Sequence, residues 1–175
     1  MKSVTIFGSA RFDENNKYYK DAFELSEVLA KNGYSITTGG GGGIMHAANK
    51  AAFLVGGVES IGINIKLPME QRLNEYCTKS IEFSDLSLRK KALMQNDVMI
   101  VCAGGYGTLD ELFEVLTLAQ TKLRNYKIIL YNEEFFKPLV DFFKNTLLNS
   151  GAIDESSLNI FSIANTPSEV LDLIK

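Results

Sequence analysis

The sequence predicts an α/β fold in which helices cover both faces of a parallel β-sheet. Short apolar runs alternate with longer segments of helical periodicity from one end of the chain to the other. Such alternation is typical of parallel strands joined by right-handed helical crossovers. The 175 residues contain no internal repeat and no linker, and this length suits one hydrophobic core. We therefore expect a single Rossmann-like domain over residues 1–175.

In the first half of the chain, short apolar runs define the strands and glycines mark the ends of the helices. Apolar side chains recur near helical spacing between residues 19 and 31, and Asn32-Gly33 ends that helix. Five glycines follow the second apolar run and lead into an alanine-rich helix. The expected strands are residues 4–7, 34–38, 60–65 and 80–83, the expected helices are 19–31 and 44–54, and a loop is expected over 66–78.

The second half continues the alternation around a strongly apolar strand, residues 98–102. Leu109, Leu112 and Leu116 lie on one side of the helix that follows it. Pro167 suits the first turn of the last helix, where no amide hydrogen is needed. The expected strands are 98–102, 127–131 and 159–163, and the expected helices are 86–95, 108–121, 135–148 and 167–174.

Composition and charge exclude several classes of function. Hydrophobic residues make up 46% of the chain and charged residues 22%, with a net charge of −3, so no basic face for duplex nucleic acid is evident. No apolar run approaches the roughly 20 residues of a membrane helix, and the N-terminus is too short and too polar for a signal peptide. We therefore expect a cytoplasmic protein that binds neither nucleic acid nor a membrane.

The chain has one histidine, His46, and two cysteines, Cys77 and Cys102, that form no CxxC pair. A zinc site built from several histidines is therefore excluded, and the cysteines are expected to be free thiols. We expect no metal and no cofactor, so carboxylates, arginine, hydroxyls and backbone amides must supply the chemistry. His46 suits either a polar helix position or a place in a pocket wall.

Three turns between a strand and a helix carry glycine or other small residues, at positions 8–10, 39–43 and 104–108. Ligands of such sheets bind outside the carboxyl ends of the strands, so we expect the three turns to converge on one crevice. In the turn over 39–43, amides at a helix start can attract an anion; the alternative is a merely flexible turn. This turn is neither a Walker sequence nor a GxGxxG fingerprint.

The turn over residues 103–111 reads Ala-Gly-Gly-Tyr-Gly-Thr-Leu-Asp-Glu. A phosphate could lie on its amides and accept a hydrogen bond from Thr108, whose hydroxyl could also cap the helix. Glu111 is the candidate carboxylate; the alternative is a capping box, in which Glu111 reaches back to the backbone. Asp110 is a rival acid. Tyr106 suits stacking on a base or ribose, or plain exposure at the tip of the turn.

A basic triplet, Arg89-Lys90-Lys91, is expected on a short helix. Such a triplet is commonly a solvated face. An arginine that faces a pocket, however, binds phosphate in a two-pronged fashion. Both interpretations stay open from the triplet alone.

Together these motifs resemble the LONELY GUY family, whose members are often mislabelled as lysine decarboxylases. The family pattern joins a Gly-Ser turn, a GGGxxGxM turn, an arginine-lysine pair and the string PGGxGTxxE. Here the motifs occupy residues 8–11, 39–45, 89–90 and 103–111, and a stretch over 62–71 matches the bacterial branch. The resemblance covers roughly residues 3–123. Gly42 and Ala103 stand where the family commonly has proline.

The resemblance implies hydrolysis of the N-glycosidic bond of a nucleoside 5′-monophosphate, AMP or a cytokinin riboside monophosphate, to a free base and ribose 5-phosphate. It implies Arg89 and Glu111 as the catalytic pair, with Lys90 as the alternative to Arg89. It also implies a homodimer, for which the apolar helix over 109–119 is our candidate interface. The residues expected to bind the substrate and its phosphate are Gly8, Ser9, Gly41, Gly42, Gly43, Met45, Lys90, Gly104, Gly105, Tyr106, Gly107 and Thr108.

A second hypothesis is a nucleotide or molybdenum-cofactor carrier without catalytic activity, because such carriers resemble this fold. It predicts tight binding without turnover. A single-strand nucleic-acid binder on the same fold is disfavoured by the acidic balance of the chain. Four phenylalanines, at positions 135, 136, 142 and 143, are expected in the core or in a subunit contact.

Overall fold

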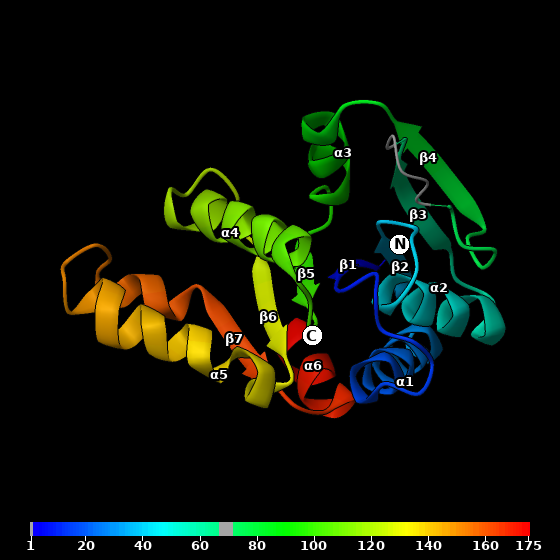
Figure 1. Ribbon diagram of the computed structural model, residues 1–175. Coiled ribbons are helices and arrows are strands. Elements are labelled where there is room, and N and C mark those ends of the chain that lie inside the picture. Colours follow the sequence, from blue (N-terminus) through cyan, green and yellow to red (C-terminus); the bar gives the residue numbers. More distant parts are fainter. Residues whose placement is uncertain (1, 67–71) are drawn as a thin grey trace.

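The computed structural model describes residues 2–66 and 72–175. Within these ranges, seven strands form one fully parallel sheet in the order β4-β3-β2-β1-β5-β6-β7 (Figure 1). The sheet confirms the predicted fold class. The strands are β1 (Ser3–Phe7), β2 (Ser35–Thr38), β3 (Ser60–Ile65), β4 (Lys79–Phe83), β5 (Val98–Val101), β6 (Lys127–Tyr131) and β7 (Phe161–Ala164).

Helices cover both faces of the sheet, and each face has its own hydrophobic core. Helices α1, α2 and α6 pack on one face, and α3, α4 and α5 pack on the other (Figure 1). The helices are α1 (Lys17–Lys31), α2 (Ile44–Val55), α3 (Leu86–Leu93), α4 (Tyr106–Gln120), α5 (Glu133–Phe142) and α6 (Pro167–Ile174). A π-helical segment (Phe143–Leu148) continues α5, and a 3-10 helix (Glu155–Asn159) precedes β7.

The central strands are apolar because both of their faces are covered. In β5, Val98 and Ile100 belong to the core beneath α1 and α2, whereas Met99 and Val101 belong to the core beneath α4 and α5. A strand buried on both sides reads as a continuous apolar run rather than as an alternation. Burying each such side chain contributes about 1.5–3 kcal/mol, so this double core holds β1 and β5 in fixed positions.

The order of the strands reverses at β1: β2, β3 and β4 are added on one side of it, and β5, β6 and β7 are added on the other. Strands β1 and β5 are therefore neighbours in the sheet although they are far apart in sequence. Phe7 lies opposite Val101, and the Cys102 amide donates to the Phe7 carbonyl. One step further along, the Ser9 amide donates to the Ala103 carbonyl at 3.0 Å. The turns that follow β1 and β5 therefore leave the sheet side by side, as expected for the ligand crevice of such a fold.

Several boundaries differ from those predicted, and local capping explains the main differences. Helix α1 begins at Lys17 because the Asn16 side chain accepts from the Tyr18 amide. Helix α4 begins at Tyr106, two residues earlier than predicted, with Gly105 as its N-cap. The helix expected over 135–148 is divided between α5 and the π-helical segment, and the last strand begins at Phe161. The loop expected over 66–78 lies partly outside the described residues, as does the stretch over 62–71.

Candidate active site

A cavity of about 700 Å³ opens at the carboxyl ends of β1 and β5. It lies at the point where the strand order reverses, which is where ligands of open parallel sheets bind. Its wall brings together the turns after β1 and β5, the first two turns of α4, one residue of α2 and one residue of α3. The lining residues are Gly8, Ser9, Ala10, Arg11, Met45, Arg89, Gly104, Gly105, Tyr106, Gly107, Thr108, Leu109 and Glu111.

Arg89 and Glu111 face each other in this cavity from two different helices. Arg89 on α3 is 8% exposed, and its Nη1 lies 3.8 Å from Oε1 of Glu111 on α4. Its Nε donates to the Ile63 carbonyl at 2.8 Å and its Nη2 donates to the Gly39 carbonyl at 3.3 Å. The guanidinium is thereby fixed between the sheet and the carboxylate.

Burial shifts the ionisation of both members of this pair. Desolvation raises the pKa of Glu111 to about 7, although the positive charge of Arg89 opposes that rise. Desolvation also lowers the pKa of Arg89, and the Glu111 carboxylate opposes that shift. A carboxyl group that titrates near neutral pH, beside a buried cation in a cavity, is a candidate for acid–base or electrostatic catalysis.

The N-terminus of α4 presents unused hydrogen-bond donors to the cavity. Within the described part of the chain, the amides of Tyr106, Gly107 and Thr108 have no hydrogen-bond acceptor, and no side chain caps this helix. Thr108 is therefore not the cap, and the capping box with Glu111 does not form. A Cβ on Gly104 would overlap the side chain of Thr108, so glycine lets Thr108 pack directly on the turn. Three free amides at a helix start suit an anion.

The other glycine-rich turn, after β2, is occupied by contacts within the protein. The Ile44 amide, the first of α2, donates to the Ser9 carbonyl at 2.8 Å, so this donor is used within the protein. Gly43 has φ +60°, and a Cβ there would overlap Ser9 and Ala10. Gly41, Gly42 and Gly43, predicted to bind the substrate, lie outside the cavity lining, whereas Met45 lies within it.

A buried polar network holds the turn over residues 39–43 in place. Asn49 is fully buried, and its Oδ1 accepts from the Thr38 hydroxyl at 2.6 Å and from Nδ2 of Asn74 at 3.0 Å. The Asn74 amide and side chain donate in turn to the carbonyls of Gly40 and Gly41. The turn is therefore rigid, which contradicts the alternative of a flexible glycine loop.

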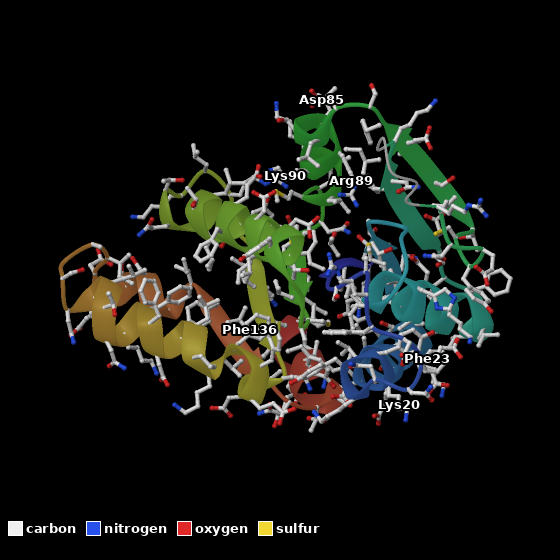
Figure 2. All side chains as sticks on the ribbon, viewed as in Figure 1. Lys20, Phe23, Asp85, Arg89, Lys90 and Phe136 are labelled. Carbon is white, nitrogen blue, oxygen red and sulfur yellow. The ribbon has the colours of Figure 1, made fainter. Side chains whose placement is uncertain are left out.

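Lys90, the predicted alternative to Arg89, lies outside the cavity lining. Its ammonium group lies 2.6 Å from Glu114 and 3.1 Å from Asp110, both on α4. Arg89 and Lys90 are adjacent on α3 (Figure 2), yet only Arg89 faces the cavity. Asp110, the rival acid, forms an ion pair with Lys90 and lies outside the cavity lining, so Glu111 is the carboxylate of the cavity. Tyr106 lines the mouth and is 93% exposed.

His46 and the cysteines lie away from the cavity lining. His46 Nδ1 is 2.7 Å from the Tyr19 hydroxyl, so the histidine is a polar helix residue. Cys77 and Cys102 are free thiols. Across residues 2–66 and 72–175, no group of three or more histidine, cysteine, aspartate or glutamate residues could hold a metal ion. In the same ranges, no helix is long and apolar enough to cross a membrane.

The predicted phenylalanine cluster divides between the core and the surface. Phe136 and Phe143 are buried, and Phe135 packs partly against the same core, whereas Phe142 is 45% exposed. Ala10 lies in the turn over 8–10 that was expected at the crevice, whereas sequence reasoning missed Arg11 and Leu109 as lining residues. Their signal was their position beside the Gly-Ser turn and the β5 turn.

A cavity at the point where the strand order of a seven-stranded parallel sheet reverses defines a Rossmann-like α/β protein. The chain belongs to the family described as "Possible lysine decarboxylase", whose family model matches residues 45–174. Among similar proteins, the probable cytokinin riboside 5′-monophosphate phosphoribohydrolase LOGL3 of Oryza sativa subsp. japonica is 31% identical, over 100% of this chain and 84% of that protein. The cytokinin riboside 5′-monophosphate phosphoribohydrolase LOG1 of Arabidopsis thaliana is 30% identical, over 98% and 81%. These matches confirm the predicted resemblance.

Solved structures share the fold over nearly the whole chain. The molybdenum cofactor binding protein of Rippkaea orientalis is 25% identical with a TM-score of 0.67, over 98% of this chain and 93% of that chain. The molybdenum cofactor carrier protein of Chlamydomonas reinhardtii has a TM-score of 0.64 at 21% identity, over 99% and 98%. The second likeness is one of fold alone.

Proposed function

We propose that this protein hydrolyses the N-glycosidic bond of a nucleoside 5′-monophosphate, releasing the free base and ribose 5-phosphate. The observation that carries the proposal is the pairing of Arg89 and Glu111 in the same cavity as the free amides of α4. Similarity to plant proteins named as cytokinin riboside 5′-monophosphate phosphoribohydrolases supports the same reaction class. AMP is the first substrate to test, with a cytokinin riboside monophosphate as the second.

The free end of α4 provides the site for the phosphate in this proposal. A phosphate dianion on the amides of residues 106–108 is stabilised by the helix dipole and by donors that lack another acceptor. The Thr108 hydroxyl, next to Gly104, supplies a further donor. Glu111 follows one turn later on the same helix, so anchoring the phosphate here holds the ribose near the carboxylate.

Glu111 then acts on the sugar. As the bond between C1′ and the base nitrogen breaks, positive charge develops on the ribose, and an adjacent carboxylate stabilises that charge. The oxygen of a water molecule forms the new bond to C1′ and loses a proton, while the base leaves with the bonding electrons and takes up a proton. With a pKa of about 7, a large share of Glu111 is ionised at neutral pH. Arg89 favours that ionised form.

The test is release of adenine from AMP, followed by chromatography, for the wild type, Glu111→Gln and Asp110→Asn. Removing a positioned catalytic carboxylate lowers rates by about 10²–10⁴-fold, so we expect a loss of this size for Glu111→Gln. Asp110→Asn removes the same charge one residue away, outside the cavity lining, and is expected to retain most of the activity. No base release from any of a panel of nucleoside monophosphates would refute the proposal.

A carrier of a nucleotide or of molybdenum cofactor is the second candidate. Its support is the 25% identity to the molybdenum cofactor binding protein of Rippkaea orientalis and the size of the cavity, about 700 Å³. A carrier binds its ligand tightly without turnover. Product formation in the AMP assay therefore separates the two candidates, because a carrier binds without releasing adenine.

A further inference from the structure

The cavity contains two arginines whose surroundings differ sharply. Arg89 is buried and already directed at two carbonyls and the Glu111 carboxylate. Arg11 also lines the cavity, but it is exposed, and its guanidinium has no hydrogen bond or ion pair to any residue in the described ranges. A guanidinium with five unused donors at the rim of an anion-binding cavity is available to a ligand.

The backbone that carries Arg11 is held firmly against the turn that carries the free amides. The Arg11 amide donates to the Ser9 hydroxyl at 3.0 Å, and the Ser9 amide donates to the Ala103 carbonyl at 3.0 Å. On its other side, the Ser9 carbonyl accepts from the Ile44 amide at 2.8 Å. The glycine turn after β2 therefore supports the Ser9–Arg11 segment, and this segment sits next to the turn after β5.

Charge balance assigns Arg11 its task. The charged residues of the described lining are Arg11, Arg89 and Glu111. Ionised Glu111 offsets the charge of Arg89, and the amides of α4 carry only partial charges. A phosphate monoester near neutral pH carries close to two negative charges, so Arg11 is the lining side chain left to balance it.

We propose that Arg11 closes the phosphate site by binding the phosphate monoester opposite the amides of α4, and thereby selects nucleotides over nucleosides. This inference rests on the proposed function for the identity of the ligand. The two arginines then have different roles: Arg89 pairs with Glu111 beside the ribose, and Arg11 binds the phosphate. Two-pronged guanidinium–phosphate pairs give both affinity and orientation.

The experiment compares Arg11→Gln, Arg11→Lys and Lys20→Gln with the wild type. Lys20 is an exposed residue on α1, well separated from Arg89 in Figure 2, so Lys20→Gln makes the same change in net charge away from the cavity. Calorimetry measures the binding of ribose 5-phosphate and of adenosine, and the KM and kcat for AMP are measured in parallel. Thermal denaturation checks that each variant is folded.

We expect Arg11→Gln to weaken ribose 5-phosphate binding and raise the KM for AMP by about 10- to 100-fold, the loss typical of a charged hydrogen-bonded pair. The kcat for AMP and the affinity for adenosine should change little. Arg11→Lys should be intermediate because it keeps the charge without the planar fork. Lys20→Gln should match the wild type.

Failure of this inference is distinct from failure of the proposed function. If the wild type binds ribose 5-phosphate and Arg11→Gln binds it equally well, the role of Arg11 is refuted while the hydrolase proposal stands. Equal losses for ribose 5-phosphate and adenosine would also refute it, because the effect would not be specific to the phosphate. If the wild type binds ribose 5-phosphate but does not hydrolyse AMP, the hydrolase proposal is refuted. The ribose 5-phosphate affinities of the wild type and Arg11→Gln still decide whether Arg11 binds the phosphate. If the wild type hydrolyses AMP without measurable binding of ribose 5-phosphate, the KM comparison decides the role of Arg11, and a wild type that neither binds ribose 5-phosphate nor hydrolyses AMP overturns both proposals.

Discussion

The two glycine-rich turns of this protein have similar sequences and different uses. After β2, the turn over 39–43 is closed by internal bonds: the Thr38 hydroxyl accepts from Gly40, Asn74 holds the carbonyls of Gly40 and Gly41, and the start of α2 donates to Ser9. After β5, the turn over 104–108 leaves its amides open to a cavity within the described residues. Glycine enrichment at a helix start therefore marks close backbone packing, and only the partners reveal whether a ligand or the protein itself takes up the donors.

The Arg89–Glu111 pair joins these two turns. Arg89 is fixed by the Gly39 carbonyl of the first turn, and Glu111 stands on the helix that begins at the second. A Cβ on Gly39 would overlap the Arg89 guanidinium, so that glycine makes room for the arginine rather than for a ligand. The turn after β2 thus supports the Arg89–Glu111 pair, whereas the turn after β5 borders the cavity.

The largest expected effect comes from adding one methyl group to each turn. Gly43→Ala places a Cβ at φ +60° against Ser9 and Ala10, and we expect it to lower the free energy of unfolding by about 3 kcal/mol. Gly107→Ala adds a Cβ within α4 that meets nothing within 4 Å, and alanine in a helix is favoured over glycine by roughly 0.5–1 kcal/mol. In urea denaturation, the free energy of unfolding should therefore fall for Gly43→Ala and rise for Gly107→Ala. Equal destabilisation by both would remove the distinction between the turns.

The second expected effect is that the free energy of unfolding depends on pH through the titration of Glu111. Because the pKa of Glu111 is raised to about 7 from 4.5, the folded state favours the protonated carboxyl. The stability this contributes is fully present below pH 4.5 and is lost as pH rises through 7. Relative to Glu111→Gln, the wild type should lose about 2 kcal/mol of unfolding free energy between pH 5.5 and pH 8.

This measurement compares urea denaturation of the two proteins at several pH values, so that other titrating groups cancel. The charges nearest Glu111 are Arg89, Asp110, Lys90 and Glu114, and they are the same in both proteins. Since the proposed reaction uses the ionised carboxylate, we expect adenine release to rise with pH and level off above 7. Parallel stability curves for the two proteins would show that Glu111 has an ordinary pKa.

The sequence predicted the fold well because its signals are local. Apolar runs, Asn32-Gly33 and the position of Pro167 are short-range features, and strands and helices followed from them. The start of α4 was misplaced because Thr108 is a good capping residue in isolation, whereas Gly105 takes the cap position in the fold. Local pattern could not decide between these two starts.

The candidate site was harder to predict because its geometry depends on contacts between distant segments. Arg89 and Lys90 are adjacent in sequence, and only the packing of α3 on β3 and α4 directs the first into the cavity and the second toward Asp110 and Glu114. The closure of the first glycine turn depends on Ser9 and Asn74, which lie about thirty residues away on either side. No spacing rule along the chain encodes such contacts.

A matched pair of threonine variants gives the smallest and most specific test of the comparison. Thr38 and Thr108 are both buried beside a glycine turn. The Thr38 hydroxyl donates to Asn49 and accepts from the Gly40 amide, so Thr38→Val should lower stability by about 1–2 kcal/mol. Thr108→Val removes a hydroxyl that has no hydrogen-bond partner in the described chain, so stability should change little. Its ribose 5-phosphate affinity should fall by roughly 3- to 10-fold.

Urea denaturation and calorimetry on the same two variants separate the roles of the two hydroxyls. A hydroxyl that is bonded within the protein affects folding first, because its loss leaves the Gly40 amide without an acceptor and removes one of the two donors to Asn49 Oδ1. A hydroxyl reserved for a ligand affects binding first, because the unliganded protein loses no hydrogen bond. If Thr108→Val were as destabilising as Thr38→Val and bound ribose 5-phosphate like the wild type, the second turn would be a support like the first, and the phosphate site would have to lie elsewhere.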